Sequence, residues 1–329
     1  MNGVLETYPW LQDGWGRLQA YLSSGRLPQA LLMTGPAGIG KRQLALLLAQ
    51  RLLCREPGEF GCGSCASCAL FKAGTHPDLL QVAPAEPAKP ITVDAIRALI
   101  AALALKPQYS GHRVVILAPA HQMNVNAANS LLKTLEEPER HTVILLLSER
   151  PAGLPATIAS RCQRFAVPLP DQARVLEFLA AQGHGERAEV LWGIAGGAPL
   201  RALQLAGTPV VETRAAFFGD WSDLAAGREQ PVAVAEKWAK AAVDDLADWM
   251  LSWTGDLIRL KSAPGRRRLD NPDLAASLQA LAARLHLTTI FEYLDRVHHA
   301  RRLLAGQVNR QLLLEELLIR WAWLARPHP

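Results

Sequence analysis

Short apolar runs alternate with amphipathic segments over the first half of the chain. Four runs have the length and composition of buried parallel strands: residues 30–35, 78–84, 113–119 and 142–148. Segments with helical spacing lie between them, at residues 41–52, 93–105 and 124–137. Asn124 suits the N-cap of the last segment, and Pro138 ends it. This alternation predicts parallel βαβ units and an α/β sheet covered on both faces.

The pattern changes after about residue 168. Asp171 can cap a short helix, and the glycines of GIAGGAPLRALQLAG (193–207) suggest a turn between two more. Beyond residue 208 the long segments have helical spacing, at 234–260, 288–306 and 309–324. Most of the nine tryptophans lie in this half, where we expect them to fill the core. The pattern thus predicts an α/β domain at 1–168, a small helical module at 169–207 and an all-helical domain at 208–329.

Residues 35–42, Gly-Pro-Ala-Gly-Ile-Gly-Lys-Arg, match the phosphate-loop pattern G-x-x-x-x-G-K up to its last position. The glycines Gly35, Gly38 and Gly40 let backbone N–H groups surround phosphates at a helix N-terminus, and Lys41 reaches the outer phosphates. Because a predicted strand precedes this loop and a predicted helix follows it, the residues indicate a P-loop fold.

The groups needed for hydrolysis are replaced. Arg42 stands where a Ser or Thr hydroxyl would bind Mg²⁺, and Ala118 and Pro119 stand where an acidic pair would hold the metal and orient water. We therefore expect no Mg²⁺ site and no ATP hydrolysis. Two interpretations of the surviving loop stay open: nucleotide binding without turnover, and a leftover loop that only shapes the turn.

Four of the five cysteines, Cys54, Cys62, Cys65 and Cys68, are clustered in CREPGEFGCGSCASC. In a cytosolic chain such clustering favours a metal over disulfides, and four thiolates without an open position suit structural Zn²⁺. An iron–sulfur cluster usually has other spacings, a redox pair needs only two cysteines, and free buried cysteines do not explain the clustering. Cys162 stands alone, and we expect it to be a small buried residue.

Composition and charge argue against a membrane protein, a secreted protein and a strongly basic nucleic-acid-binding protein. No apolar stretch reaches the roughly 18 residues that a membrane span needs, and the N-terminus lacks the layout of a secretory signal. We therefore expect a cytoplasmic protein without a membrane partner. The formal charge of +5 is modest, and the basic clusters at 266–268 and 296–302 are interpreted as solvated loop and helix faces.

LLKTLEEP (131–138), a following strand and Ser160-Arg161-Cys162 resemble the AAA+ clamp-loader subunits of bacterial DNA polymerase III. The cysteine cluster and GTHPD (74–78) resemble the delta-prime-like members of that family. The resemblance covers nearly the full chain. It implies a RecA-like domain at 1–168 with a four-cysteine zinc module inserted at 54–68, a helical lid at 169–207, and a collar at 208–329 that joins a five-subunit ring.

The resemblance also implies roles for single residues. Arg161 would be an arginine finger that reaches the ATP site of a neighbouring motor subunit, where a guanidinium stabilises charge on the transferred phosphoryl group. The alternative is that Arg161 pairs with a local carboxylate and anchors a loop. Arg201 stands at the sensor-2 position, where it would brace the lid if the site is empty, and Ser148 is near sensor 1.

The leading hypothesis is a non-hydrolysing part of a DNA-directed DNA polymerase holoenzyme that helps load a sliding clamp onto primed DNA, with tau/gamma and delta subunits as partners. An active AAA+ motor is disfavoured by Arg42, Ala118 and Pro119, and a P-loop kinase would need the same magnesium ligands. A zinc-dependent DNA-binding module on a P-loop fold is disfavoured by the moderate charge and by the lack of a basic helix after the cysteines.

Overall fold

The computed structural model describes residues 8–56, 58–86, 89–109, 111–241, 243–262, 268–304 and 308–325. Arg266 and Arg267 of the first basic cluster lie outside these ranges. The chain divides into two compact units, Met1–Arg174 and Val175–Pro329, and each is described by itself.

The first unit is built on a five-stranded sheet with the order β2-β3-β4-β1-β5, in which all neighbouring strands are parallel. The strands are β1 (Ala30–Thr34), β2 (Leu79–Val82), β3 (Arg113–Leu117), β4 (Thr142–Ser148) and β5 (Gln163–Ala166). The four predicted strands are confirmed. The edge strand β5 was not predicted, because only Phe165 of its four residues is buried and the segment lacks an apolar run.

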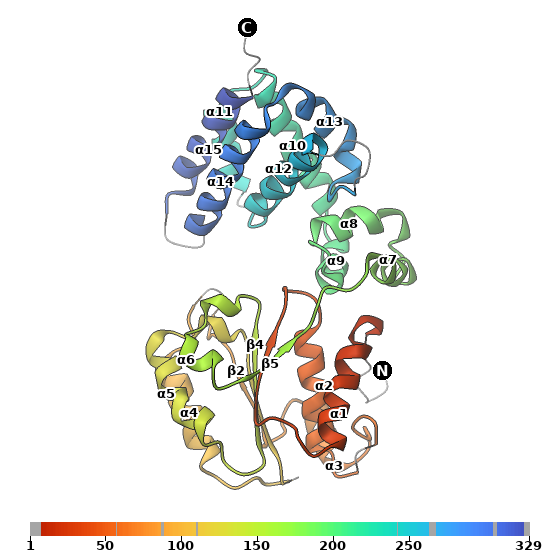
Figure 1. Cartoon of the computed structure of the whole chain (residues 1–329), viewed down its shortest axis with the longest axis vertical. Coiled ribbons are helices and arrows are strands. Elements are labelled where there is room, and N and C mark those ends of the chain that lie inside the picture. Colours follow the sequence, from red (N-terminus) through yellow and green to blue (C-terminus); the bar gives the residue numbers. More distant parts are fainter. Residues whose placement is uncertain are drawn as a thin grey trace. The chain divides into compact units, whose positions relative to one another are not determined.

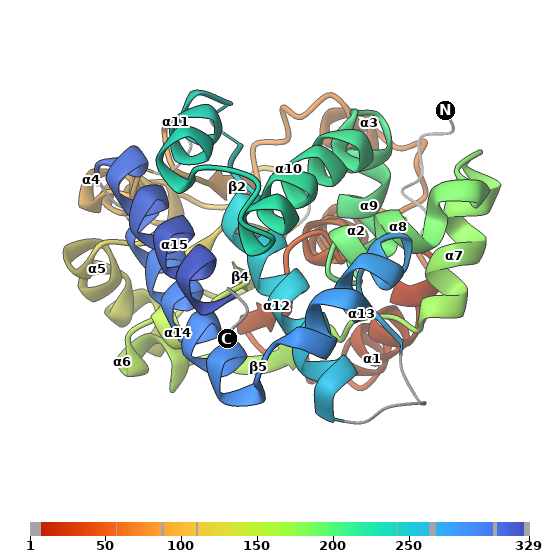
Figure 2. The same ribbon diagram turned by 90° about the horizontal axis from the view of Figure 1, so that it is seen from above.

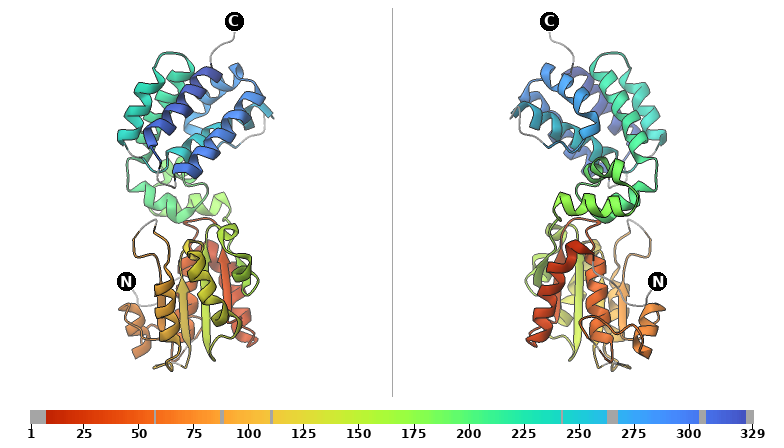
Figure 3. Two further views of the ribbon diagram at one scale, coloured as in Figure 1. Left: turned by 90° about the vertical axis from the view of Figure 1, so that its left-hand side faces the viewer. Right: turned by 90° about the vertical axis from the view of Figure 1, so that its right-hand side faces the viewer.

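Helices cover both faces of this sheet, with α1 and α2 on one side and α4 and α5 on the other (Figures 1 and 3). Apolar side chains of the strands and of α4 and α5, among them Leu32, Val115, Ile144, Leu99 and Leu131, form one buried cluster. The unit contains α1 (Gln12–Ser23), α2 (Lys41–Leu53), α3 (Ala66–Lys72), α4 (Val93–Leu103), α5 (Val125–Glu136) and α6 (Ala156–Ala159), with short 3-10 turns at Pro9–Leu11, Ala120–Gln122 and Pro151–Gly153.

Helix α5 begins as predicted, because the side chain of Asn124 accepts a hydrogen bond from the N–H of Ala127 at 2.8 Å. Replacing Asn124 with alanine leaves that N–H without its cap, so we expect a loss of about 1 kcal/mol in the free energy of unfolding, measured by urea denaturation. The exposed Asn126 in the same helix is the control, and its replacement by alanine should change stability by less than about 0.5 kcal/mol. Equal effects of the two changes would contradict the capping role.

The second unit is entirely helical in the residues that the structure describes. Its helices are α7 (Gln172–Ala181), α8 (Ala188–Ile194), α9 (Pro199–Ala206), α10 (Val210–Ala225), α11 (Pro231–Ala241), α12 (Leu246–Ser262), α13 (Ala275–Arg284), α14 (Leu287–Leu304) and α15 (Arg310–Leu324), with 3-10 turns at Gly185–Arg187 and Pro272–Leu274. Helices α14 and α15 lie side by side (Figure 2). The segment 234–260, which has helical spacing throughout its sequence, forms two helices, α11 and α12.

Tryptophans fill the core of the second unit, as predicted from their distribution. The fully buried rings of Trp221 and Trp321 are stacked with centroids 3.8 Å apart, and the indole of Trp321 donates to the carbonyl of Trp221 at 2.8 Å. Val175 and Ala202, from the segment predicted as a lid, belong to the same buried cluster as Trp221. The predicted lid therefore shares its core with the predicted collar, and the boundary at residue 207 stays a prediction.

No single helix among the described residues is long and apolar enough to cross a membrane. Pro272–Arg284 and Leu287–Leu304 together have the length and composition of a membrane-spanning segment, but the two helices are bent by 118° relative to each other. Leu278 of the first segment and Ile290 of the second are buried in the core of the helical unit.

Candidate functional site

The phosphate loop joins the end of β1 to the start of α2, as its sequence predicts. Gly40 is the N-cap of α2 and has a φ of 96°, and Gly35 has a φ of 150°. A Cβ atom on Gly35 would lie 2.3 Å from the carbonyl oxygen of Val167, and one on Gly40 would lie 2.8 Å from the side chain of Leu11. Gly35 is therefore required by its contact with the backbone of Val167, and Gly40 by its positive φ, which other residues rarely adopt.

Lys41 is buried, and its ammonium group interacts with its own chain. Its Nζ donates to the carbonyl oxygens of Gly35 at 2.9 Å and Pro36 at 2.6 Å. The carboxylate of Glu149, just after β4, lies 3.5 Å from the same nitrogen. Burial lowers the pKa of Lys41, and the charge of Glu149 partly counteracts that shift. The side chain expected to meet phosphate is thus satisfied by two carbonyls and a carboxylate.

The positions that would hold magnesium carry no carboxylate. The guanidinium of Arg42 donates to the side-chain oxygen of Gln81 on β2 at 2.8 Å. Ala118 and Pro119 follow the end of β3 directly. The buried Ser148, at the end of β4, lies with its hydroxyl 3.2 Å from Nδ1 of His121.

Arg161 lies in the three-residue connection between the short helix α6 and β5. Its Nε donates to a carboxylate oxygen of Glu136 at 2.7 Å, and its Nη2 contacts the same oxygen. Its Nη1 donates to the carbonyl of Thr157 at 3.0 Å. The local carboxylate considered as the alternative partner of Arg161 is therefore present, and Glu136 belongs to the LLKTLEEP segment. The adjacent Cys162 is buried, and burial raises the pKa of its thiol to about 11.

Arg201 lies on α9 and forms an ion pair with Asp245, between α11 and α12, at 2.5 Å. It thus connects helices within the second unit. The basic cluster on α14 is also partly paired, since Arg296 lies 3.4 Å from Glu316 and Arg301 lies 2.8 Å from Asp248. These carboxylates reduce the positive charge available to nucleic acid on that helix.

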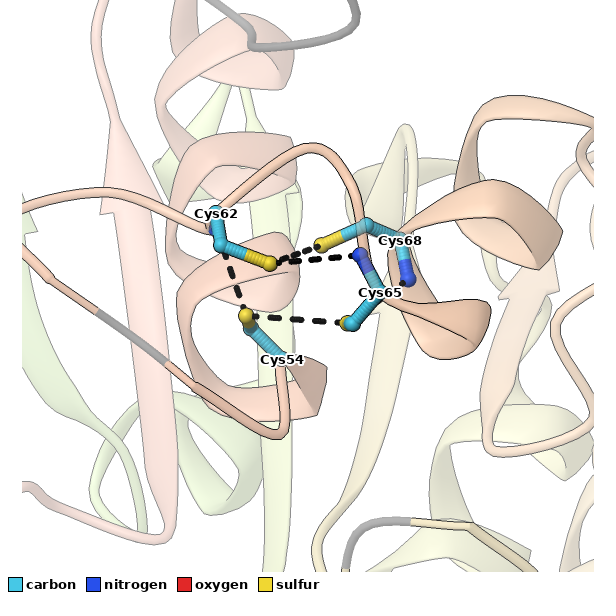
Figure 4. Close-up of side chains that lie close together, drawn as sticks. All are labelled: Cys54, Cys62, Cys65 and Cys68. Carbon is cyan, nitrogen blue, oxygen red and sulfur yellow. Dashed lines mark hydrogen bonds between the residues drawn. The ribbon is translucent and has the colours of Figure 1, made fainter.

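The four clustered cysteines converge from three places in the chain (Figure 4). Cys54 caps the end of α2, Cys62 lies in the following loop, Cys65 caps the start of α3, and Cys68 lies within α3. All four sulfur atoms are within 4.8 Å of one another, and the pairs Cys54–Cys65 and Cys62–Cys68 are each 3.9 Å apart. The spacing in the sequence therefore does bring the predicted ligands together.

This arrangement fits a tetrahedral metal ion. Zn–S bonds of about 2.3 Å in a tetrahedron separate the sulfurs by about 3.8 Å, close to the distances found here. Backbone N–H groups of Ser64 and Cys65 lower the pKa of the Cys62 thiol to about 6, whereas burial raises that of Cys68 to about 12. The Cys62 thiol thus ionises easily and the Cys68 thiol resists ionisation. A divalent cation would favour the thiolate form of all four ligands. The four cysteines can thus hold a metal ion such as zinc.

A buried hydrogen-bond network joins the cysteine module to the sheet. The hydroxyl of Ser67 donates to the carbonyl of Leu53 and lies 2.8 Å from Nε2 of His76, whose Nδ1 accepts from the N–H of Asp78 at 3.1 Å. The carboxylate of Asp78 then accepts from the N–H groups of Gln108 and Tyr109, both at 2.8 Å. GTHPD therefore has a structural role, since its histidine and aspartate anchor the module.

Sequence reasoning missed several partners of the predicted site residues. Glu149, Gln81, Glu136 and Asp245 are isolated polar residues whose spacing carries no motif for pairing, apart from the position of Glu136 in LLKTLEEP. Trp10 was also missed, although its indole donates to the carbonyl of Ile39 in the phosphate loop at 2.9 Å. Only the fold brings these side chains together, because their partners are distant in the sequence.

Comparisons with known proteins find relatives that match nearly the whole chain. A model of the family "DNA polymerase III, delta subunit" matches residues 11–170, and one of its C-terminal region matches residues 211–322. DNA polymerase III subunit delta' of Pseudomonas aeruginosa is 40% identical over 98% of this chain and 100% of its own length. The subunit of the same name in Escherichia coli K12 is 31% identical over 95% and 94%. A gamma-subunit-related protein of Thermotoga maritima has a TM-score of 0.49 at 17% identity, covering 96% of this chain and 100% of its own.

The tau subunit of Escherichia coli K12 is 34% identical over 50% of this chain and 26% of its own length. A parallel sheet of this order, a phosphate loop after β1 and this kinship with tau define a RecA-like AAA+ subunit of the clamp-loader class, followed by a helical region. Within that class, the Pseudomonas aeruginosa and Escherichia coli relatives that match nearly the full length of the chain are both delta' subunits. The chain belongs to the DNA polymerase III subunit delta' family.

Proposed function

We propose that this chain is a non-hydrolysing subunit of the cytoplasmic replicative clamp loader, and that it supplies Arg161 in trans to the ATP site of a neighbouring motor subunit. It would act beside tau/gamma and delta subunits to load the sliding clamp onto primed DNA. The observation that carries the proposal is the state of its own phosphate site, where cationic and apolar side chains replace the magnesium ligands.

Three features of that site support the lack of hydrolysis. Arg42 puts a cation where a metal-binding hydroxyl is needed, and it is hydrogen-bonded to Gln81. The end of β3 offers Ala118 and Pro119, which can neither bind Mg²⁺ nor orient a water molecule. The ammonium of Lys41 is already satisfied by carbonyls and by Glu149.

A role in trans is supported by the exposure of Arg161. Its side chain is 33% exposed at the junction of α6 and β5, although it pairs with Glu136. An exposed ion pair of this kind contributes only about 0–1 kcal/mol, so it leaves the guanidinium available to a phosphate of a neighbouring subunit. The local pairing with Glu136 and a function in trans are therefore compatible.

Assembly into a hetero-oligomeric ring is supported by one face of α15. Leu312, Ile319 and Trp323 are 60%, 49% and 54% exposed, and their spacing of seven and four residues places them on the same side of the helix. Apolar side chains aligned in this way are typical of a protein–protein interface. We assign this face to contacts with other subunits of the complex.

The cysteine module would hold one structural zinc ion through Cys54, Cys62, Cys65 and Cys68. Four thiolates complete the tetrahedral shell, so no position is left for a substrate or a catalytic water. The ion would tie the end of α2 to α3. Its contribution is therefore to the stability of the first unit.

The isolated chain tests the first part of the proposal. We expect ATP hydrolysis by the purified protein with Mg²⁺ to be no faster than hydrolysis by its Lys41→Ala variant, because both lack the metal ligands. The measurement is phosphate release at saturating ATP, with and without DNA. Turnover that requires Lys41 would show that the chain is an active motor and would refute the proposal.

A further inference from the structure

The carboxylate of Glu136 accepts hydrogen bonds from the guanidinium of Arg161. We propose that Glu136 is a positioning residue for the arginine finger, fixing the guanidinium in the orientation that a neighbouring phosphate meets. This inference rests on the function proposed for Arg161. It concerns the geometry of the finger, which the sequence motif alone does not reveal.

The contacts divide the guanidinium into two edges. Glu136 contacts the side edge through Nε and Nη2. Nη1 donates to the carbonyl of Thr157 at 3.0 Å and makes only a long contact of 3.4 Å to Ser160 Oγ. The outer edge, between Nη1 and Nη2, is therefore the one that a phosphate can approach. No acceptor among the described residues contacts both Nη1 and Nη2, and a carboxylate on the side edge suits a bidentate arginine that is oriented before its ligand arrives.

Glu136 and Arg161 are both held in place by the same buried apolar cluster. Helix α5 carries Glu136 as its last residue, and Leu131 and Leu135 of that helix are buried. Ile158 of α6 and Cys162, next to Arg161, lie in the same buried cluster as these leucines. The ion pair is thus set by the fold of the first unit, and it does not depend on a mobile loop.

Helix stability does not explain Glu136. The C-terminal end of a helix carries partial negative charge, so an acidic residue there is unfavourable unless another group compensates it. Arg161 is that group, and the two side chains are 33% and 47% exposed, which leaves them accessible to a partner. The next residue, Glu137, is also acidic and exposed, but it forms no ion pair with the described residues. Only one of the two glutamates is aimed at the finger.

The test compares Glu136→Gln with Glu137→Gln, its matched neighbour, in a complete complex reconstituted from this chain, its motor and delta partners, the clamp and primed DNA. Glutamine keeps the shape of the side chain and removes the charge that orients the guanidinium. We expect Glu136→Gln to lower kcat for the ATP site that Arg161 serves about two- to fivefold. The KM for ATP and the assembly of the complex should not change, and Glu137→Gln should behave as wild type.

The double variant Glu136→Gln, Arg161→Ala separates positioning from an independent structural effect. If Glu136 acts only through Arg161, the double variant has the same kcat as Arg161→Ala alone. Additive losses, an unchanged kcat in Glu136→Gln, or a faster kcat in that variant would each overturn the inference. If Arg161→Ala itself leaves kcat unchanged, the proposed finger fails and the positioning role fails with it. A loss in Arg161→Ala without one in Glu136→Gln refutes the positioning role alone.

Discussion

Replacing Arg161 with alanine should slow ATP hydrolysis at the neighbouring motor site by about a thousandfold, because arginine fingers supplied in trans contribute roughly 10³–10⁵ to the rate of phosphoryl transfer. The transferred phosphoryl group spreads negative charge over its oxygens, and a fixed guanidinium stabilises that charge. The measurement is single-turnover hydrolysis in the reconstituted complex with clamp and primed DNA. Sites served by other subunits should keep their rates, so one kinetic phase disappears and the rest remain.

Two further variants sharpen this result. Arg161→Lys keeps the charge and loses the planar fork, so we expect it to recover only part of the rate. Arg164, exposed on β5 and without an ion pair among the described residues, is the matched control, and its replacement by alanine should leave every phase intact. If Arg161→Ala assembles normally and hydrolyses ATP like the wild type, Arg161 only anchors the junction of α6 and β5 through Glu136.

Removal of the metal should be the largest change in stability. A ligand present at a thousand times its dissociation constant stabilises the folded state by about 4 kcal/mol. For a unit of this size, that loss lowers Tm by about 8–16 °C, at roughly 2–4 °C per kcal/mol. We expect one zinc per chain by elemental analysis of the purified protein, and the lower Tm after treatment with a strong chelator. Readdition of Zn²⁺ should restore it.

The cysteines supply their own control. Cys65→Ser should lose the zinc and show the reduced Tm without chelator, because it removes one of the four thiolates, while serine can still cap the start of α3. Cys162→Ala removes the fifth cysteine, which lies outside the cluster, and should keep one zinc per chain. A protein purified without metal that shows the same Tm before and after added Zn²⁺ would contradict a structural role.

Those features that depend on local pattern were predictable. The three central strands, β3, β4 and β1, are buried, so each appears in the sequence as an apolar run, and the glycines and Lys41 mark the turn after β1. The cysteine cluster was predictable for a similar reason. Its ligands are close in the sequence, and a short loop rich in glycine brings them together without help from distant residues.

Features that depend on distant contacts were not predictable. The pairing of Lys41 with Glu149 arises because β1 and β4 are neighbours in the sheet, and the sequence does not state their order. The break between α11 and α12 was also missed, because the apolar spacing continues through it. There the carbonyl of Asp245 accepts from the N–H of Trp249 and begins a new helix, while its carboxylate pairs with Arg201.

The close fit of the phosphate loop has an evolutionary consequence. A side chain at Gly35 would meet the backbone of Val167, and one at Gly40 would need an unfavourable positive φ, so a larger residue at either place disturbs the fold whether or not a nucleotide is ever bound. Natural selection for folding alone can therefore preserve the glycine pattern after catalysis has been lost. In such lineages the motif records ancestry, and only the residues that hold magnesium and orient water report on present activity.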